Sequence, residues 1–284
     1  MATLHKEFTS FNGLIALANK KKEDLIKSRN ELRRKIKKWF SDNKPDELQP
    51  KFYGQGSSEM NTTVNPIVVE DDSGNKLYKY DLDYGVYFIE KEGDDNRRGI
   101  NTLHDWVYSA VENHTTQPPI KKNTCVRVIF ADGHHIDLPI YYKDGDIPEL
   151  AHKSRGWFES DPKAFTEWFN NEVKENQQIR RIVRYLKAWK NFRELNNTNL
   201  TLPSGFALSI LAVENYKPDE NDDVAFRKTV ERIKETLDSK FECIRPTTPI
   251  ENVLSEYSET KKNNFLTTLQ SLIDDCNRAY NEKN

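Results

Sequence analysis

The sequence has few cysteines, no long apolar run and almost no net charge, and each shortage excludes a class of protein. Three cysteines in 284 residues, widely spaced, fit neither a disulfide framework nor a zinc cluster, which indicates a reducing cytosol. No run of about 18 apolar residues occurs, so no membrane-spanning helix is predicted. The N-terminus has no apolar core followed by a cleavage site, so we expect no export signal.

The charge is nearly balanced, with 43 Lys and Arg against 45 Asp and Glu and a net charge of −2. A protein that grips duplex nucleic acid needs a continuous basic face. Basic clusters occur at residues 20–22, 33–38 and 180–181, but solvated helix surfaces commonly carry such charges. We therefore expect that duplex DNA or RNA is not required by this protein.

Apolar residues recur at helical spacing over residues 3–40 and predict a long N-terminal helix, a spine behind a sheet. Gly13 and the lysines at 20–22 are the places where a break is expected. Pro45 ends the helix, because proline disfavours helical backbone at the residue before it.

The rest of the chain changes character near residue 160. Before it, strand, helix and hairpin patterns alternate, which is typical of a mixed α/β lobe. After it, helical spacing predominates, over residues 164–168, 173–189, 206–216, 224–237 and 249–280. The prediction is an α/β fold with two lobes, residues 1–160 and 161–284, and an active site lining the cleft between them.

A Gly-x-Gly-Ser-Ser turn at residues 54–58 follows a short apolar run. Such a turn offers backbone N–H groups and two hydroxyls, which a polyphosphate needs. Further on, Asp81 and Asp83 lie in a run rich in Tyr, Val, Phe and Ile, which predicts a strand with both carboxylates on one face. Two carboxylates at one spot repel each other unless a divalent cation lies between them, so the pair predicts Mg²⁺.

A third acidic strand follows. Residues 124–142 predict a hairpin with an Asp-Gly turn, and Asp137 stands among apolar residues on its second strand. A charge in that position needs a partner, and we expect a metal shared with Asp81 and Asp83. Asp132 in the turn is the next candidate for the third carboxylate. Between the two motifs, residues 67–69 predict a short extra strand and residues 71–75 a turn.

The order of a Gly-Ser turn, an Asp-x-Asp strand and an apolar-Asp-apolar-Pro strand resembles the polymerase-β-type nucleotidyltransferases. The particular resemblance is to the branch of oligoadenylate synthases, cyclic GMP-AMP synthase and the bacterial CD-NTases. It implies a polymerase-β-like mixed sheet lobe with a helical lobe, and two Mg²⁺ ions, with Mn²⁺ as an alternative. The implied metal-binding and catalytic residues are Asp81, Asp83 and Asp137. The implied nucleotide-binding residues of this lobe are Gln55, Gly56 and Ser57.

The second lobe carries a weaker part of the resemblance. Leu-Lys-Ala-Trp at 186–189 and Pro-Ser-Gly-Phe at 203–206 are similar to the family's helical lobe. The resemblance implies Lys187 for phosphate, Ser204 for phosphate or base, and Phe206 for stacking on the base. The chemistry of each residue type agrees with its role. No insertion with zinc-ligand spacing occurs, which favours the bacterial CD-NTases over the animal DNA sensor.

Within that branch, the resemblance implies synthesis of a cyclic di- or trinucleotide signal from ATP, GTP or other nucleoside triphosphates in anti-phage (CBASS) defence. The implied protein is a cytoplasmic monomer whose product acts on a downstream effector protein. Two alternatives stay open. One is a nucleotidyltransferase that modifies RNA or protein, and the other is an inactive fold that binds nucleotide or a partner. The three carboxylates argue against the second, because buried charges without a counter-ion cost free energy.

Overall fold

The structure is a computed structural model that describes residues 4–67, 69–70, 76–77, 80–91 and 96–282. Contacts divide the chain into two compact units. The sheet unit comprises residues 18–60 and 66–166, and the helical unit comprises residues 1–17, 61–65 and 167–284. The predicted division at residue 160 differs from this one, because it assigned residues 1–17 and 61–65 to the sheet lobe.

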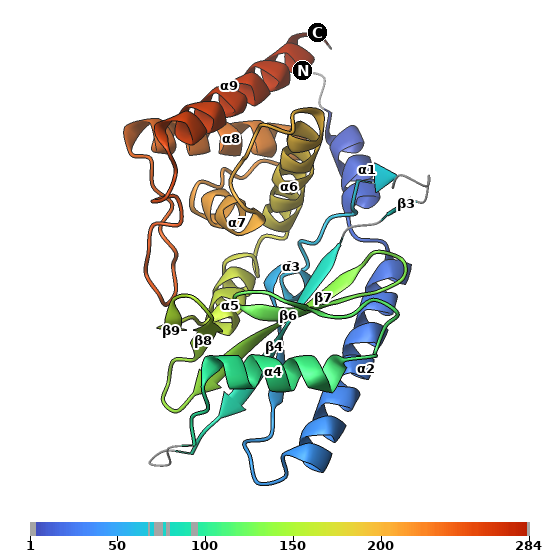
Figure 1. Ribbon diagram of the computed structural model, residues 1–284. Coiled ribbons are helices and arrows are strands. Elements are labelled where there is room, and N and C mark those ends of the chain that lie inside the picture. The colour runs from blue at the N-terminus through green and yellow to red at the C-terminus, as the bar shows by residue number, and fades with distance from the viewer. Residues whose placement is uncertain (1–3, 68, 71–75, 78–79, 92–95, 283–284) are drawn as a thin grey trace. The chain divides into compact units, whose positions relative to one another are not determined.

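The sheet unit is built on a mixed sheet whose strand order is β1-β4-β7-β6-β5; Figure 1 labels its strands β4, β6 and β7. At its centre, β4 (Asp81–Ile89) and β7 (His135–Lys143) pair in parallel. The flanking strands β1 (Lys51–Gln55) and β6 (Cys125–Ile129) run antiparallel to β4 and β7, respectively. The predicted Asp-x-Asp strand, the predicted hairpin and the mixed α/β class are therefore confirmed.

Shorter strands complete this unit. They are β5 (Ile120–Lys121), β8 (Glu149–His152) and β9 (Gly156–Glu159), and a separate pair of β2 (Val69–Glu70) with β3 (Lys76–Leu77). β8 and β9 were not predicted from the sequence, because runs of four residues are too short to display an alternating pattern. The extra strand predicted at 67–69 overlaps β2 only at Val69. Residue 68 of that strand and the turn predicted at 71–75 lie outside the described residues.

Two helices cover the sheet and give this unit its core. α2 (Asn19–Asn43) and α4 (Ile100–Val111) lie side by side (Figure 1). The Phe40 ring of α2 lies 5.5 Å from the Phe88 ring of β4 and 6.2 Å from the Trp106 ring of α4. Apolar side chains of β4 and β7 are buried along most of both strands, as expected of central parallel strands.

The single N-terminal helix predicted over residues 3–40 is wrong in one respect: it is two helices. α1 (His5–Ile15) belongs to the helical unit, and α2 belongs to the sheet unit. Ala16 and Ala18 are extended, and the Asn65 side chain donates hydrogen bonds to the carbonyls of Leu14 and Ala16. These tertiary bonds satisfy backbone groups that a continuous helix would have used, so the break falls between the two predicted places.

The helical unit contains α6 (Gln178–Asn196), α7 (Gly205–Glu214), α8 (Asp222–Ser239) and α9 (Glu259–Glu282), and α5 (Pro162–Glu172) crosses the boundary between the units. Asp222 is fully buried and accepts hydrogen bonds from Arg181 at 2.6 and 2.8 Å and from the Tyr185 hydroxyl at 2.8 Å. This carboxylate ties α6 to α8.

The last predicted helix begins ten residues later than expected, at Glu259 instead of Pro249. Residues 249–258 fold back on the preceding segment, where the backbone N–H of Arg245 donates to the Glu251 carbonyl and the backbone N–H of Val253 donates to the Cys243 carbonyl. These non-helical backbone bonds outcompete the helical preference of the segment.

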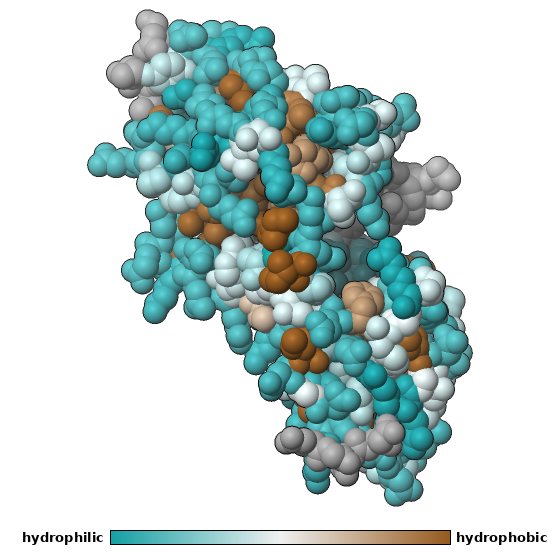
Figure 2. All heavy atoms as spheres, turned by 90° about the vertical axis from the view of Figure 1, so that its left-hand side faces the viewer, coloured by the Kyte–Doolittle hydropathy of each residue, from teal (hydrophilic) through white to brown (hydrophobic). Residues whose placement is uncertain are grey.

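Figure 2 shows one face of the molecule, on which apolar side chains form small groups separated by hydrophilic ones. The mean hydropathy of −0.84 agrees with this distribution. In the part of the chain that the structure describes, no helix is both apolar and long enough to traverse a bilayer.

Candidate functional site

Strand pairing brings the predicted acidic residues of the sheet unit together. In the parallel β4–β7 pair, Asp83 lies opposite Asp137 and Asp81 lies opposite His135. In the antiparallel β1–β4 pair, Gln55 lies opposite Asp83. Neighbouring strands are about 5 Å apart, so Gln55, Asp83 and Asp137 form a row across three strands. We call Asp81, Asp83 and Asp137 the carboxylate cluster.

The Gly-Ser turn begins at the end of this row. Gly56 starts the short helix α3 (Gly56–Glu59) with a φ of 70°, a left-handed conformation that favours glycine. A Cβ atom at this position would lie 2.9 Å from Oδ2 of Asp83. Glycine therefore lets the Asp83 carboxylate lie directly against the turn, with Ser57 as the next residue.

Gln55 is buried, and its amide is used inside the sheet unit. Its Nε2 donates to the Tyr141 hydroxyl at 3.3 Å, and its Oε1 accepts from the Tyr87 hydroxyl at 3.4 Å. Both tyrosines lie on the central strands β4 and β7. The side chain of Gln55 thus fixes the end of β1 from which the Gly-Ser turn starts.

Asp83 is the most perturbed acid of the cluster. Its pKa is raised to about 7, chiefly by burial and further by the neighbouring carboxylates Asp81 and Asp137, while the charges of Arg127 and Lys122 oppose the rise. This is the repulsion that the Asp-x-Asp pattern predicts. A cation bound beside Asp83 would favour its charged form.

Asp137 has a partner that the sequence analysis did not foresee. Arg127 of β6 lies opposite it and donates from Nε to Oδ1 at 2.6 Å and from Nη2 to Oδ2 at 2.7 Å. Lys122 Nζ lies 4.0 Å from Oδ2. The expectation that Asp137 needs a partner agrees with this pair, but the partner in the structure is a guanidinium, and the shared metal stays a prediction. A two-residue Asp132-Gly133 loop would have placed Val128 opposite Asp137, so the sequence pattern does not reveal this pair and only the observed register does.

The carboxylate cluster fits a divalent cation by its chemistry, since carboxylate oxygens are the ligands that Mg²⁺ prefers. The raised pKa of Asp83 points the same way, because its charge lacks a full counter-ion. Among the described residues, however, no three His, Cys, Asp or Glu side chains already stand in an arrangement that would hold a metal ion. Both oxygens of Asp137 accept a hydrogen bond from Arg127, so Arg127 would compete with a metal for this carboxylate.

Asp132, the alternative third carboxylate, lies outside the row. It sits in the β6–β7 turn, where Oδ1 lies 2.5 Å from Nδ1 of His134 and Oδ2 accepts from the Tyr80 hydroxyl at 3.3 Å. The other ring nitrogen of His134 lies 3.2 Å from the Ser28 hydroxyl of α2. Asp132 therefore joins the turn to α2 and to the start of β4.

The predicted residues of the helical unit gather at the start of α7. Lys187 is buried, and its ammonium donates to Oγ1 of Thr62 at 2.9 Å. A Cβ atom added to Gly205 would lie 3.0 Å from Cε of Lys187. Ser204 is the N-cap of α7, and its hydroxyl accepts from the Ala207 N–H at 3.2 Å. The Phe206 ring lies 5.5 Å from the Arg245 guanidinium.

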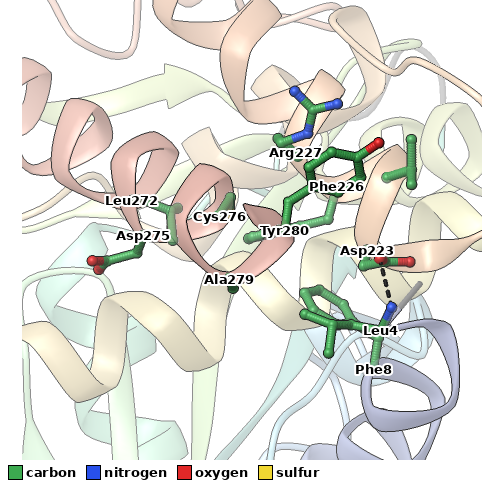
Figure 3. Close-up of a pocket in the computed structure, with 11 residues that line it drawn as sticks. Leu4, Phe8, Asp223, Phe226, Arg227, Leu272, Asp275, Cys276, Ala279 and Tyr280 are labelled. Atoms are coloured by element: carbon green, nitrogen blue, oxygen red, sulfur yellow. Dashed lines mark hydrogen bonds between the residues drawn. The ribbon is translucent and has the colours of Figure 1, made fainter. Parts of the chain in front are cut away.

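The helical unit also holds a cavity of ≈ 210 Å³ between α1, α8 and α9 (Figure 3). Its wall is mostly apolar, with Phe8, Phe226 and Leu272 among the lining residues. Asp223 at its edge accepts a hydrogen bond from the backbone N–H of Leu4 at 2.8 Å. None of the predicted nucleotide-binding residues lines it, and its apolar wall does not suit a triphosphate.

Replacing Asp83 by Asn is expected to stabilise the metal-free protein more at pH 8 than at pH 5. The pKa of Asp83 is about 7 in the folded chain, above its ordinary value, so folding takes up a proton between these values. The stability from this group is full below its ordinary pKa and is lost as the pH rises through 7. We expect Tm in EDTA at pH 8 to rise by about 5 °C.

Thermal unfolding at both pH values measures this, with Asp146→Asn as a control, since Asp146 is exposed. A gain of equal size at pH 5 and pH 8 would mean that the effect of Asn has nothing to do with charge.

Comparison with known proteins places the sheet unit's motifs in one family model. The family model described as "Cyclic GMP-AMP synthase DncV-like, nucleotidyltransferase domain" matches residues 50–141. This range contains both the Gly-Ser turn and the carboxylate cluster. A cyclic GMP-AMP synthase of Escherichia albertii is 31% identical over 244 residues, which are 84% of this chain and 51% of the relative. The chain spans about half the length of the curated relatives it matches.

Solved structures agree in fold. The DncV cyclic AMP-GMP synthase of Vibrio cholerae, in complex with nonhydrolyzable GTP, superposes with a TM-score of 0.80 at 18% identity, over 98% of this chain and 91% of that one. The CD-NTase CdnG of Bradyrhizobium diazoefficiens, in complex with GTP, gives a TM-score of 0.76 at 15% identity, over 98% and 92%. The described elements are therefore those of a two-lobed polymerase-β-like fold.

Proposed function

The chain belongs to the DncV-like bacterial CD-NTases, and from this membership we propose that it joins nucleoside triphosphates into a cyclic di- or trinucleotide. The observation that carries the proposal is the row of Asp83 and Asp137 on adjacent parallel strands, with the Gly56 turn against Asp83. Acid groups and a phosphate-binding turn at one spot are what nucleotidyl transfer requires of a protein.

In this proposal, Asp81, Asp83 and Asp137 hold divalent metal, with two Mg²⁺ ions as the expected complement. When bound, such ions neutralise the triphosphate and make the acceptor hydroxyl a better nucleophile. Asp81 and Asp83 come from one strand and serve the donor side, while Asp137 comes from the neighbouring strand and serves the acceptor side. The raised pKa of Asp83 supports the assignment, because a buried acid short of counter-charge is typical of a functional site.

In the sheet unit, the donor triphosphate is assigned to the Gly56–Ser57 turn. Gly56 and Ser57 offer backbone N–H groups and a hydroxyl, and Gln55 fixes the turn through its bonds to Tyr141 and Tyr87. In the helical unit, Lys187 and Ser204 would contact phosphate, and Phe206 would stack on the base. The buried position of Lys187 beside Gly205 supports a role beyond a solvated surface charge.

The family also suggests a biological setting for the reaction. The product would be a signal in anti-phage (CBASS) defence, read by a downstream effector protein, and the synthase would work as a monomer in the cytosol, where its triphosphate substrates are. Duplex nucleic acid is not proposed as an activator, since the net charge of −2 does not favour binding to a polyanion.

Incubating the purified chain with each nucleoside triphosphate alone and in mixtures, with Mg²⁺ and without any added duplex, tests the proposal. We expect pyrophosphate release and a cyclic product on chromatography, both removed by excess EDTA and restored by Mg²⁺ or Mn²⁺. Turnover that persists undiminished in EDTA would sink the metal-dependent mechanism. Transfer that occurs only when RNA or protein is added would identify a nucleotidyltransferase with another acceptor.

A further inference from the structure

The Arg127–Asp137 pair is placed where the proposed function needs a metal ligand. Arg127 meets Asp137 in the β6–β7 register and donates to both of its oxygens, at 2.6 and 2.7 Å. A guanidinium that binds a carboxylate through two parallel bonds makes one of the stronger side-chain interactions in proteins. Both side chains are largely buried, with exposed fractions of 22% and 12%, so solvent screens the pair only in part.

The pair has two consequences for the carboxylate cluster. Arg127 brings a positive charge beside the acids of the cluster, so it compensates the buried charge of Asp137 and part of the charge of neighbouring Asp83. The same charge repels an incoming cation, and the same bonds occupy the oxygens that the cation would need. Arg127 therefore holds Asp137 in place and, at the same time, opposes the binding of a cation to the carboxylate cluster.

We infer that Arg127 is a positioning residue that competes with divalent metal for Asp137 and so sets the metal concentration at which the carboxylate cluster fills. Asp137 exchanges its partner, from the guanidinium to the metal, without leaving the β4–β7 register that places it beside Asp83. The inference rests on the proposed function, because it takes the carboxylate cluster to be the metal site.

The chain offers a matched pair of cations for testing this. Arg127 binds both oxygens of Asp137, whereas Lys122 carries the same charge 4.0 Å from one of them. Arg127→Gln removes the charge and the two bonds, and Lys122→Gln removes only a nearby charge. Arg127→Lys keeps the charge but cannot reproduce the planar two-bond contact.

Isothermal titration of each folded protein with Mn²⁺ at pH 8, without nucleotide, measures the competition directly. We expect Arg127→Gln to bind Mn²⁺ about tenfold more tightly than the unmodified chain, because a competing charge and two bonds are removed. Arg127→Lys should bind a few times more tightly and Lys122→Gln should change least. In the absence of metal, Arg127→Gln should also melt at a lower temperature than the unmodified chain, and Mn²⁺ should raise its Tm by more.

Mn²⁺ affinity that is unchanged or weaker in folded Arg127→Gln overturns the inference. If Arg127→Gln does not fold, Arg127→Lys decides, and an affinity equal to that of the unmodified chain overturns the inference in the same way. An unmodified chain that binds no Mn²⁺, or binds it equally well after Asp83→Asn, contradicts the proposed function itself. The experiment therefore distinguishes a failure of the role inferred for Arg127 from a failure of the proposed function.

Discussion

Replacing Asp81 and Asp83 together by Asn is expected to abolish both nucleotidyl transfer and Mg²⁺-dependent binding of nucleoside triphosphate. The two residues begin β4, and Asp83 lies against the Gly56 turn that is assigned to the triphosphate. Asn keeps the size of each side chain but removes the charge that a divalent cation needs. We expect turnover to fall by about a thousandfold or more, since the metal contributes several kcal/mol to such reactions.

The chain contains its own control for this double variant. Asp144 and Asp146 have the same spacing but are exposed beyond the end of β7, away from the strand row. Asp144→Asn with Asp146→Asn should leave pyrophosphate release and triphosphate affinity near those of the unmodified chain. Equal losses in both double variants would point to net charge, and no loss in the first would remove β4 from the metal site.

Asp137→Asn is expected to separate binding from chemistry. Asp137 lies on β7, across from Asp83, and is assigned to the acceptor side of the site. Without its carboxylate, the donor still has Asp81, Asp83 and the Gly-Ser turn, so Mg²⁺-dependent triphosphate affinity should stay within a few-fold. Transfer should fall by about a thousandfold, because a step that needs both sides of the site loses one.

Triphosphate affinity with Mg²⁺ and product formation, measured on the same preparations, test this expectation. Asp132→Asn is the matched control, because Asp132 is a nearby acid that binds His134 and the Tyr80 hydroxyl instead of joining the row. Near-normal turnover in Asp137→Asn would mean that the third carboxylate is misassigned, and loss of turnover in Asp132→Asn would then make Asp132 its replacement.

The sheet unit could be predicted from the sequence because its signals are local and specific. The Asp-x-Asp strand, the Asp-Gly hairpin and the Gly-Ser turn each have a residue pattern with a physical cause, and their order led to the family whose model matches residues 50–141. The mutual repulsion inferred for Asp81 and Asp83 also agrees with the raised pKa of Asp83. These features depend on neighbours in sequence or on the pleat of one strand.

What escaped prediction depends on contacts between distant segments. Arg127 becomes the partner of Asp137 only through the register of two strands. The helix break at residues 16–18 is made by Asn65, about fifty residues away, and the late start of α9 is made by bonds between residues 243–245 and 251–253. Helical periodicity contains no information on such competitors, because tertiary contacts override local preference.

The roles of Lys187, Ser204 and Phe206 stay predictions of a different kind. Their grouping at the start of α7 agrees with a common task, but each also has a structural role inside the helical unit: Lys187 binds Thr62, Ser204 caps α7, and Phe206 lies against Arg245. A residue that caps a helix or fills a core needs no ligand to explain it. The carboxylate cluster differs, because the raised pKa of Asp83 is costly to a protein without a cation to bind.

The most direct test of the carboxylate site is a crystal structure of the chain with Mn²⁺ and a nonhydrolysable nucleoside triphosphate, with the ions located by anomalous scattering. The account predicts anomalous peaks bound by Asp81, Asp83 and Asp137, the triphosphate on the Gly56–Ser57 turn, and at least one Asp137 oxygen released from Arg127. Peaks and triphosphate bound elsewhere, with Asp137 still held by Arg127 through both oxygens, would contradict it.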